Sequence, residues 1–148
     1  MTPSELIDAD WAPCPDQAGF IDLVGPFWQR PGDDGPRYGF VARPEHANLI
    51  GVVQGGMLMT FADRVLGLRA WSLVDGTPCV TVQFEMQFVA ATRIGDLVEL
   101  QPEVVHRTSS LIFLRGTLTT QGRPVAAATG IWKVLRRAAP RAAARSTE

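Results

Sequence analysis

The sequence predicts a two-layer α+β protein in which one long central helix packs against an antiparallel sheet of about six strands. Three observations lead to this prediction. The 148 residues are 46% hydrophobic and 20% charged, which suits a single globular domain. Residues 55–73 contain no proline and are almost entirely apolar, which indicates a buried helix. Residues 80–89 alternate between apolar and polar side chains, which is typical of a strand.

The expected strands lie on both sides of this helix in the sequence. Two precede it, joined by a turn over residues 31–36, where proline, glycine and aspartate predominate. A loop over residues 44–54 leads into the helix, and Asp-Gly-Thr-Pro at residues 75–78 ends it. The six expected strands cover residues 20–29, 37–43, 80–89, 97–106, 110–120 and 124–135.

The chain divides into an N-terminal arm (residues 1–18), one domain (19–135) and a basic tail rich in arginine and alanine (136–148). The net charge is −1, but four arginines and only one acidic residue lie in the tail. The rest of the chain therefore carries ten basic against fourteen acidic residues. Because binding to nucleic acid needs clustered cations, we expect no nucleic-acid partner.

Metal, disulfide and membrane roles are poorly supported. Two cysteines, Cys14 and Cys79, do not make a disulfide framework, and His46 and His106 lie far apart without metal-ligand spacing. The longest stretch without ionisable groups, residues 47–62, is too short and too polar to cross a bilayer. We therefore expect no metal, no membrane association and a cytoplasmic location.

Asp63 is the most unusual residue of the predicted helix, because a carboxylate in an apolar environment is costly unless it is paired. It is either a general base or a solvated residue on a partly wet stripe of the helix. The second unusual feature is Gln54-Gly55-Gly56, where the helix begins. Free N–H groups of a first helical turn can bind an oxyanion or a polarised carbonyl, although a Gly-Gly pair is also typical of a flexible joint.

The spacing of these two features favours a dimer. Gly55 and Asp63 are eight residues apart, which is about 12 Å along a helix axis and about 80° in direction. One helix therefore cannot direct both groups at a single reacting carbon, whereas two antiparallel copies related by a two-fold axis can. The helix is also apolar on too many sides for one sheet, which suggests that a second chain covers it.

Residues 46–63 resemble the signature of the hotdog-fold acyl-CoA thioesterases, in the branch of the phenylacetate-pathway thioesterase and human thioesterase superfamily member 2. That signature runs Asn, Gly, His-Gly-Gly and then Asp in the central helix. The matching residues here are Asn48, Gly51, Gln54-Gly55-Gly56 and Asp63. The resemblance covers about residues 20–135 and implies a hotdog fold. It also implies an acyl-CoA substrate, no cofactor, and a homodimer with shared sites that assembles as a dimer of dimers, a homotetramer.

The resemblance assigns a role to each of these positions. Asp63 matches the general base or nucleophile, and Gly55 the backbone N–H that polarises the thioester carbonyl. Asn48 matches an amide that holds the substrate or the attacking water, and Thr81 the hydroxyl that orients this water. One subunit supplies Asn48 and Gly55, and the other supplies Asp63 and Thr81. Further substrate-binding candidates are Gly56, Val82 and Arg93.

Two residues, Gln54 and Thr81, do not fit these assigned roles directly. Gln54 stands where this branch usually has histidine, so this position can donate an N–H but cannot carry a titrating proton. Thr81 shares a strand face with Gln83 and Glu85, so reaching Asp63 requires a bulge or the strand's edge at the dimer seam. The alternatives are a non-catalytic acyl-CoA-binding hotdog protein, a hotdog dehydratase or hydratase, whose histidine motif is not matched here, and a structural dimer.

Overall fold

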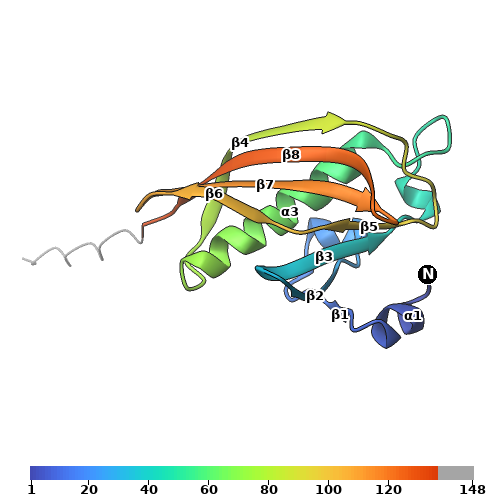
Figure 1. Cartoon of the computed structure of the whole chain (residues 1–148), viewed down its shortest axis with the longest axis horizontal. Helices are drawn as coiled ribbons and strands as arrows, with labels where there is room; N and C mark the ends of the chain where they lie inside the picture. The colour runs from blue at the N-terminus through green and yellow to red at the C-terminus, as the bar shows by residue number, and fades with distance from the viewer. Residues whose placement is uncertain (137–148) are drawn as a thin grey trace, which may run out of the picture.

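The computed structural model describes residues 1–136 and shows a long helix packed against a curved antiparallel sheet (Figure 1). The sheet of the described residues has eight strands in the order β1-β2-β3-β5-β7-β8-β4, and β6 also pairs with β7. The elements are α1 (Pro3–Asp8), β1 (Ala12–Pro13), α2 (Phe20–Val24), β2 (Trp28–Gly32), β3 (Gly35–Val41), the 3-10 turn η1 (Pro44–His46), α3 (Gly55–Leu73), β4 (Cys79–Phe88), β5 (Leu97–Leu100), β6 (Glu103–Arg107), β7 (Leu111–Thr120) and β8 (Arg123–Val134).

The central helix α3 has the bounds predicted from its apolar run. Phe61 is fully buried and packs against Phe27 and Phe40, with ring centroids 5.2 and 4.8 Å away. Other parts of the helix surface are less covered, since Met59 and Trp71 are exposed in the single chain. One sheet therefore covers only part of the apolar surface of α3, as expected.

Three predictions about the strands are wrong. Residues 20–29 are not one strand, because the short helix α2 comes first and Gly25-Pro26 separates it from β2. The expected strand 97–106 is divided into β5 and β6 at Pro102, which has no N–H for a ladder hydrogen bond. A further two-residue strand, β1, pairs with β2. These changes raise the count of strands in the described residues from six to eight.

The N-terminal arm packs onto the domain. Thr2 caps α1. Leu6 and Trp11 are buried and pack with Trp28 in a small second core. Of the predicted basic tail, residues 137–148 lie outside the described residues. None of the helices formed by residues 1–136 has the length and hydropathy needed to cross a membrane.

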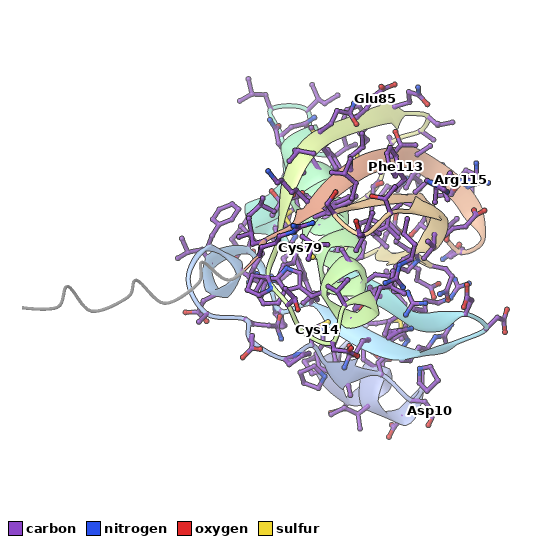
Figure 2. The ribbon with its side chains drawn as sticks, turned by 90° about the vertical axis from the view of Figure 1, so that its left-hand side faces the viewer. Asp10, Cys14, Cys79, Glu85, Phe113 and Arg115 are labelled. Carbon is purple, nitrogen blue, oxygen red and sulfur yellow. The ribbon has the colours of Figure 1, made fainter. Side chains whose placement is uncertain are left out.

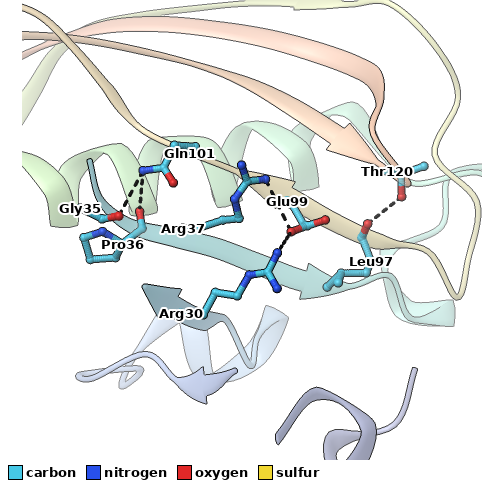
Figure 3. Close-up of polar contacts among 8 residues, drawn as sticks. All are labelled: Arg30, Gly35, Pro36, Arg37, Leu97, Glu99, Gln101 and Thr120. Atoms are coloured by element: carbon cyan, nitrogen blue, oxygen red, sulfur yellow. Dashed lines mark hydrogen bonds and ion pairs between the residues drawn. The ribbon is translucent and has the colours of Figure 1, made fainter. Parts of the chain in front are cut away.

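Polar contacts tie together the strands furthest from β4 (Figure 3). Glu99 on β5 accepts a hydrogen bond from Arg30 at 3.2 Å and lies 3.7 Å from the guanidinium of Arg37. The Thr120 hydroxyl donates to the Leu97 carbonyl at 2.7 Å. Among residues 1–136, in contrast, the edge strand β4 pairs only with β8, and no strand of these residues pairs with its other side.

Candidate active site

The structure brings Asp63 and Thr81 into direct contact. Asp63 is half-buried on α3, and Thr81 lies on β4. The Thr81 hydroxyl donates a hydrogen bond of 2.7 Å to Oδ1 of Asp63. This bond holds one carboxylate oxygen in place and leaves Oδ2 free to accept a proton. The pair therefore has the geometry of an oriented general base.

A β-bulge explains how Thr81 faces the helix. Thr81 pairs with Trp132 and Gln83 with Ile131, so Val82 is the extra residue of the bulge. An unbroken alternation would place Val82 on the face of Phe84 and turn Thr81 away from α3. With the bulge, Thr81 shares the helix-facing side with Phe84, and Val82 is 52% exposed. Of the two expected ways for Thr81 to reach Asp63, a bulge or the strand's edge at the dimer seam, the structure shows the bulge.

Asp63 and Thr81 line an open cavity of about 450 Å³. Arg64 also lines it, but its guanidinium donates to the backbone carbonyl of Asp16 and forms no ion pair with Asp63 among the described residues. Burial raises the pKa of the Cys79 thiol at the cavity wall. This thiol therefore stays protonated at neutral pH and is a poor nucleophile. Figure 2 labels Cys79, which is the first residue of β4.

The N-terminus of α3 leaves backbone donors free. Gln54 is the N-cap, and its carbonyl accepts from the N–H groups of Met57 at 2.9 Å and Leu58 at 3.3 Å. No group of residues 1–136 accepts a hydrogen bond from the N–H of Gly55 or Gly56. The Gln54 side chain is exposed and makes no capping hydrogen bond. Two amide donors and one side-chain amide thus lie together at the positive end of the helix dipole.

The loop before α3 is held by Asn48. Its Oδ1 accepts from the N–H groups of Ile50 at 3.0 Å and Val52 at 3.2 Å, and Gly51 adopts a φ of 84° that favours glycine. The amide oxygen is thus used internally, and the amide NH₂ is the part left for a ligand. A β-bridge from Val52 to Arg93 places the exposed residue Arg93 beside this loop.

The predicted site residues therefore form two separate groups in one chain. Asp63 and Thr81 share one cavity, whereas Gly55 lines another of about 360 Å³ near Phe88. Gly55 and Asp63 are eight residues apart in the helix, which is about 12 Å along its axis. A single chain does not assemble both groups around one small reacting centre.

Sequence reasoning missed Gly67 and Trp132 in the wall of the Asp63 cavity. Trp71 is 41% exposed and lines the cavity together with Gly67. The available signal was the spacing, because Gly67 and Trp71 follow Asp63 at intervals of four residues. Trp132 also lines the cavity, and no local pattern connects β8 with α3.

His46 serves the structure rather than the candidate chemistry. It is 4% exposed, its Nδ1 accepts from the Arg43 N–H at 3.0 Å, and its Nε2–H donates to the Val24 carbonyl at 2.7 Å. These two contacts make His46 a local hydrogen-bonding residue. Burial is the largest effect on this imidazole and lowers its pKa.

This shift predicts a pH-dependent stability. As the pH falls below about 6.5, His46 is protonated more readily in the unfolded chain than in the folded chain, so the unfolded state binds more protons. The free energy of unfolding should fall as the pH drops through this range, by at most about 1.4 kcal/mol per pH unit. Urea unfolding between pH 7.5 and about 5.5 measures this slope. His46→Gln should flatten it, His106→Gln is the control, and equal slopes for His46→Gln and the unmodified chain would contradict the prediction.

Comparisons with known proteins agree with this geometry. The thioesterase superfamily matches residues 50–127, more than half of the chain. A Pseudomonas aeruginosa protein named "Putative esterase PA0474" is 34% identical over 116 residues, which cover 76% of this chain and 85% of that protein. Human "Acyl-coenzyme A thioesterase 13" is 25% identical over 77 residues, which cover 52% of this chain and 55% of the relative.

A solved structure extends the likeness to the fold. The hypothetical thioesterase protein of Streptococcus pneumoniae, crystallised with coenzyme A, has a TM-score of 0.69 and 26% identity, over 76% of this chain and 91% of that one. The central helix, the curved antiparallel sheet and the family match confirm the predicted hotdog fold. The family match also confirms the predicted class of enzyme, a thioester hydrolase. The chain belongs to the thioesterase superfamily.

Proposed function

We propose that this chain is an acyl-CoA thioesterase that hydrolyses its substrate to a free acid and coenzyme A. The observation that carries the proposal is the 2.7 Å hydrogen bond from the Thr81 hydroxyl to Asp63 at the wall of an open cavity. A relative named acyl-coenzyme A thioesterase and a similar structure that holds coenzyme A support this choice of substrate.

In the proposed reaction, Asp63 acts on a water molecule. Thr81 holds Oδ1, and Oδ2 removes a proton from the water as its oxygen attacks the thioester carbon. The tetrahedral intermediate then breaks its C–S bond, and the proton held by Asp63 passes to the departing thiolate. Water and thioester thus become carboxylic acid and thiol. Because a thiolate leaves readily, this route uses neither a metal nor a cofactor.

The oxyanion of the intermediate requires donors that Asp63 and Thr81 do not supply. The N–H of Gly55 is free and lies at a helix N-terminus, where a negative charge is stabilised. The exposed Gln54 amide is a second donor, Asn48 helps to hold the substrate, and Arg93 is a candidate contact for the phosphates of coenzyme A.

We place these donors on a second chain. Within one chain Gly55 and Asp63 lie too far apart, and the surfaces beside both groups are unusually apolar for an exposed surface. Leu49 and Ile50 are 105% and 83% exposed before α3, and Val82 and Phe88 are exposed on the open edge strand β4. An unprotected apolar edge is typical of a contact surface. The dimer of dimers stays a prediction.

Mixing two inactive variants tests the shared site. Asp63→Asn and Gly55→Pro chains are co-expressed with different tags, and the mixed dimers are assayed. In a mixed dimer, one site lacks both groups and the other has both, so the mixed dimers should have about half of the activity of the unmodified dimer. Sites contained within single chains would give no recovery, which would contradict the shared arrangement.

Gln54 favours one second candidate, a non-catalytic acyl-CoA-binding protein, because glutamine cannot transfer a proton as the usual histidine can. A thiol-release assay over a panel of acyl-CoA thioesters separates the two functions. Its background is low because Cys14 and Cys79 are buried, and burial raises the pKa of Cys14 to about 12. Binding without thiol release would favour this second function and reject the thioesterase.

A further inference from the structure

The cavity beside Asp63 continues along α3 toward the end of the helix. Asp63, Gly67 and Trp71 all line it and are spaced four residues apart, so they follow one another along one side of α3. Trp71 lies about 12 Å from Asp63 along the axis. The wall of the cavity therefore runs from the candidate general base, past a residue without a side chain, to an indole ring.

Gly67 keeps the middle of this cavity open. A Cβ atom at this position would lie 3.3 Å from Nε1 of Trp132, which is tighter than ordinary van der Waals contact. Trp132 is only 1% exposed and packs edge-on against Phe84, with ring centroids 6.5 Å apart, so its indole has little room to move. Any side chain at residue 67 would narrow the space between α3 and β8.

Trp71 forms a fixed wall at the far end. Its indole N–H donates to the backbone carbonyl of Cys79 at 3.1 Å, which ties the ring to the start of β4. The ring is nevertheless 41% exposed. Burial of such a large apolar ring by a ligand would contribute a favourable free energy. Leu68 adds further apolar surface to the same cavity. An apolar group that enters past Asp63 would cover this surface and stop at the indole.

We propose that Gly67 and Trp71 determine the acyl specificity of this chain. Gly67 opens a slot beside the reacting carbonyl and Trp71 closes its far end, so the site accepts compact acyl groups and rejects long unbranched ones. The inference rests on the proposed thioesterase function, since it places the acyl group next to Asp63. A volume of about 450 Å³ lies in the range of small-molecule pockets.

A chain-length series tests the slot through binding as well as turnover. Non-hydrolysable thioether analogues from acetyl- to palmitoyl-CoA are titrated by calorimetry, and the thioesters themselves are assayed for thiol release. In the unmodified protein, affinity should rise about fourfold for each buried methylene group, reach a limit, and then fall. Trp71→Ala should bind the first rejected chain about tenfold more tightly. Gly67→Ala should move the limit to shorter chains.

Ser72→Ala is the matched control, because Ser72 is an exposed neighbour of Trp71 on α3 outside the cavity lining. Thermal unfolding of each variant shows that the fold is retained. If the Trp71→Ala and unmodified proteins have the same chain-length limit, the proposed role of Trp71 in acyl specificity is contradicted, even if both proteins release thiol. If the binding limits shift as expected but no acyl-CoA releases thiol, the proposed role of Gly67 and Trp71 is supported and the proposed hydrolysis is contradicted.

Discussion

Replacing Asp63 with asparagine is expected to lower kcat for acyl-CoA hydrolysis by about 10²- to 10⁴-fold, the usual contribution of a general base. Asparagine has nearly the same shape, and its amide oxygen can still accept the 2.7 Å hydrogen bond from Thr81. It has no carboxylate oxygen to take a proton from water. The loss should therefore appear in kcat, while KM and the thermal unfolding temperature change little.

Steady-state kinetics by thiol release, together with thermal unfolding, measure this effect. Thr81→Ser is the matched control, because it keeps the hydroxyl that contacts Asp63 and removes only a methyl group from an exposed position. This control should keep kcat within about tenfold of the unmodified value. An Asp63→Asn protein as active as the Thr81→Ser protein would refute the role assigned to the carboxylate.

Replacing Gly55 with proline is expected to lower kcat by about 10²- to 10³-fold, the usual effect of removing one oxyanion donor. Gly55 is the first residue of α3, the position at which proline is most readily accepted in a helix. Gln54 before it has φ −57° and ψ 133°, a conformation that suits the residue preceding proline. Since no described residue accepts a hydrogen bond from the Gly55 N–H, the fold should lose no internal hydrogen bond.

Gly55→Ala separates the missing N–H from the added carbon atoms. It keeps the donor and places a Cβ 3.2 Å from the ring of Phe88, a contact that the proline variant shares. Phe88 is 53% exposed, so its ring can give way by the few tenths of an ångström required. The alanine variant should stay much more active than the proline variant. Equal kcat values for the two would show that the Gly55 N–H does not stabilise the transition state.

The bounds of the central helix could be predicted from the local sequence pattern alone. The proline-free apolar run gave the bounds of α3, because helix formation depends on neighbouring residues and on the break at residues 75–78. The secondary structure of residues 20–29 was harder to predict. Their apolar content suits a strand, but Gly25-Pro26 allows a short helix to end before β2 begins. Short apolar runs do not distinguish the two structures by periodicity alone.

The sequence by itself determined that a carboxylate lies within an apolar helix whose first turn is Gly-Gly, and that the chain resembles the hotdog thioesterases. Only the tertiary structure decided that Thr81 meets Asp63, through a bulge at Val82, and that Gly67, Trp71 and Trp132 shape the adjoining cavity. The physical reason is that helical spacing is set by local hydrogen bonds. Strand register and bulges depend instead on a partner strand, here β8, that lies about fifty residues away in the sequence.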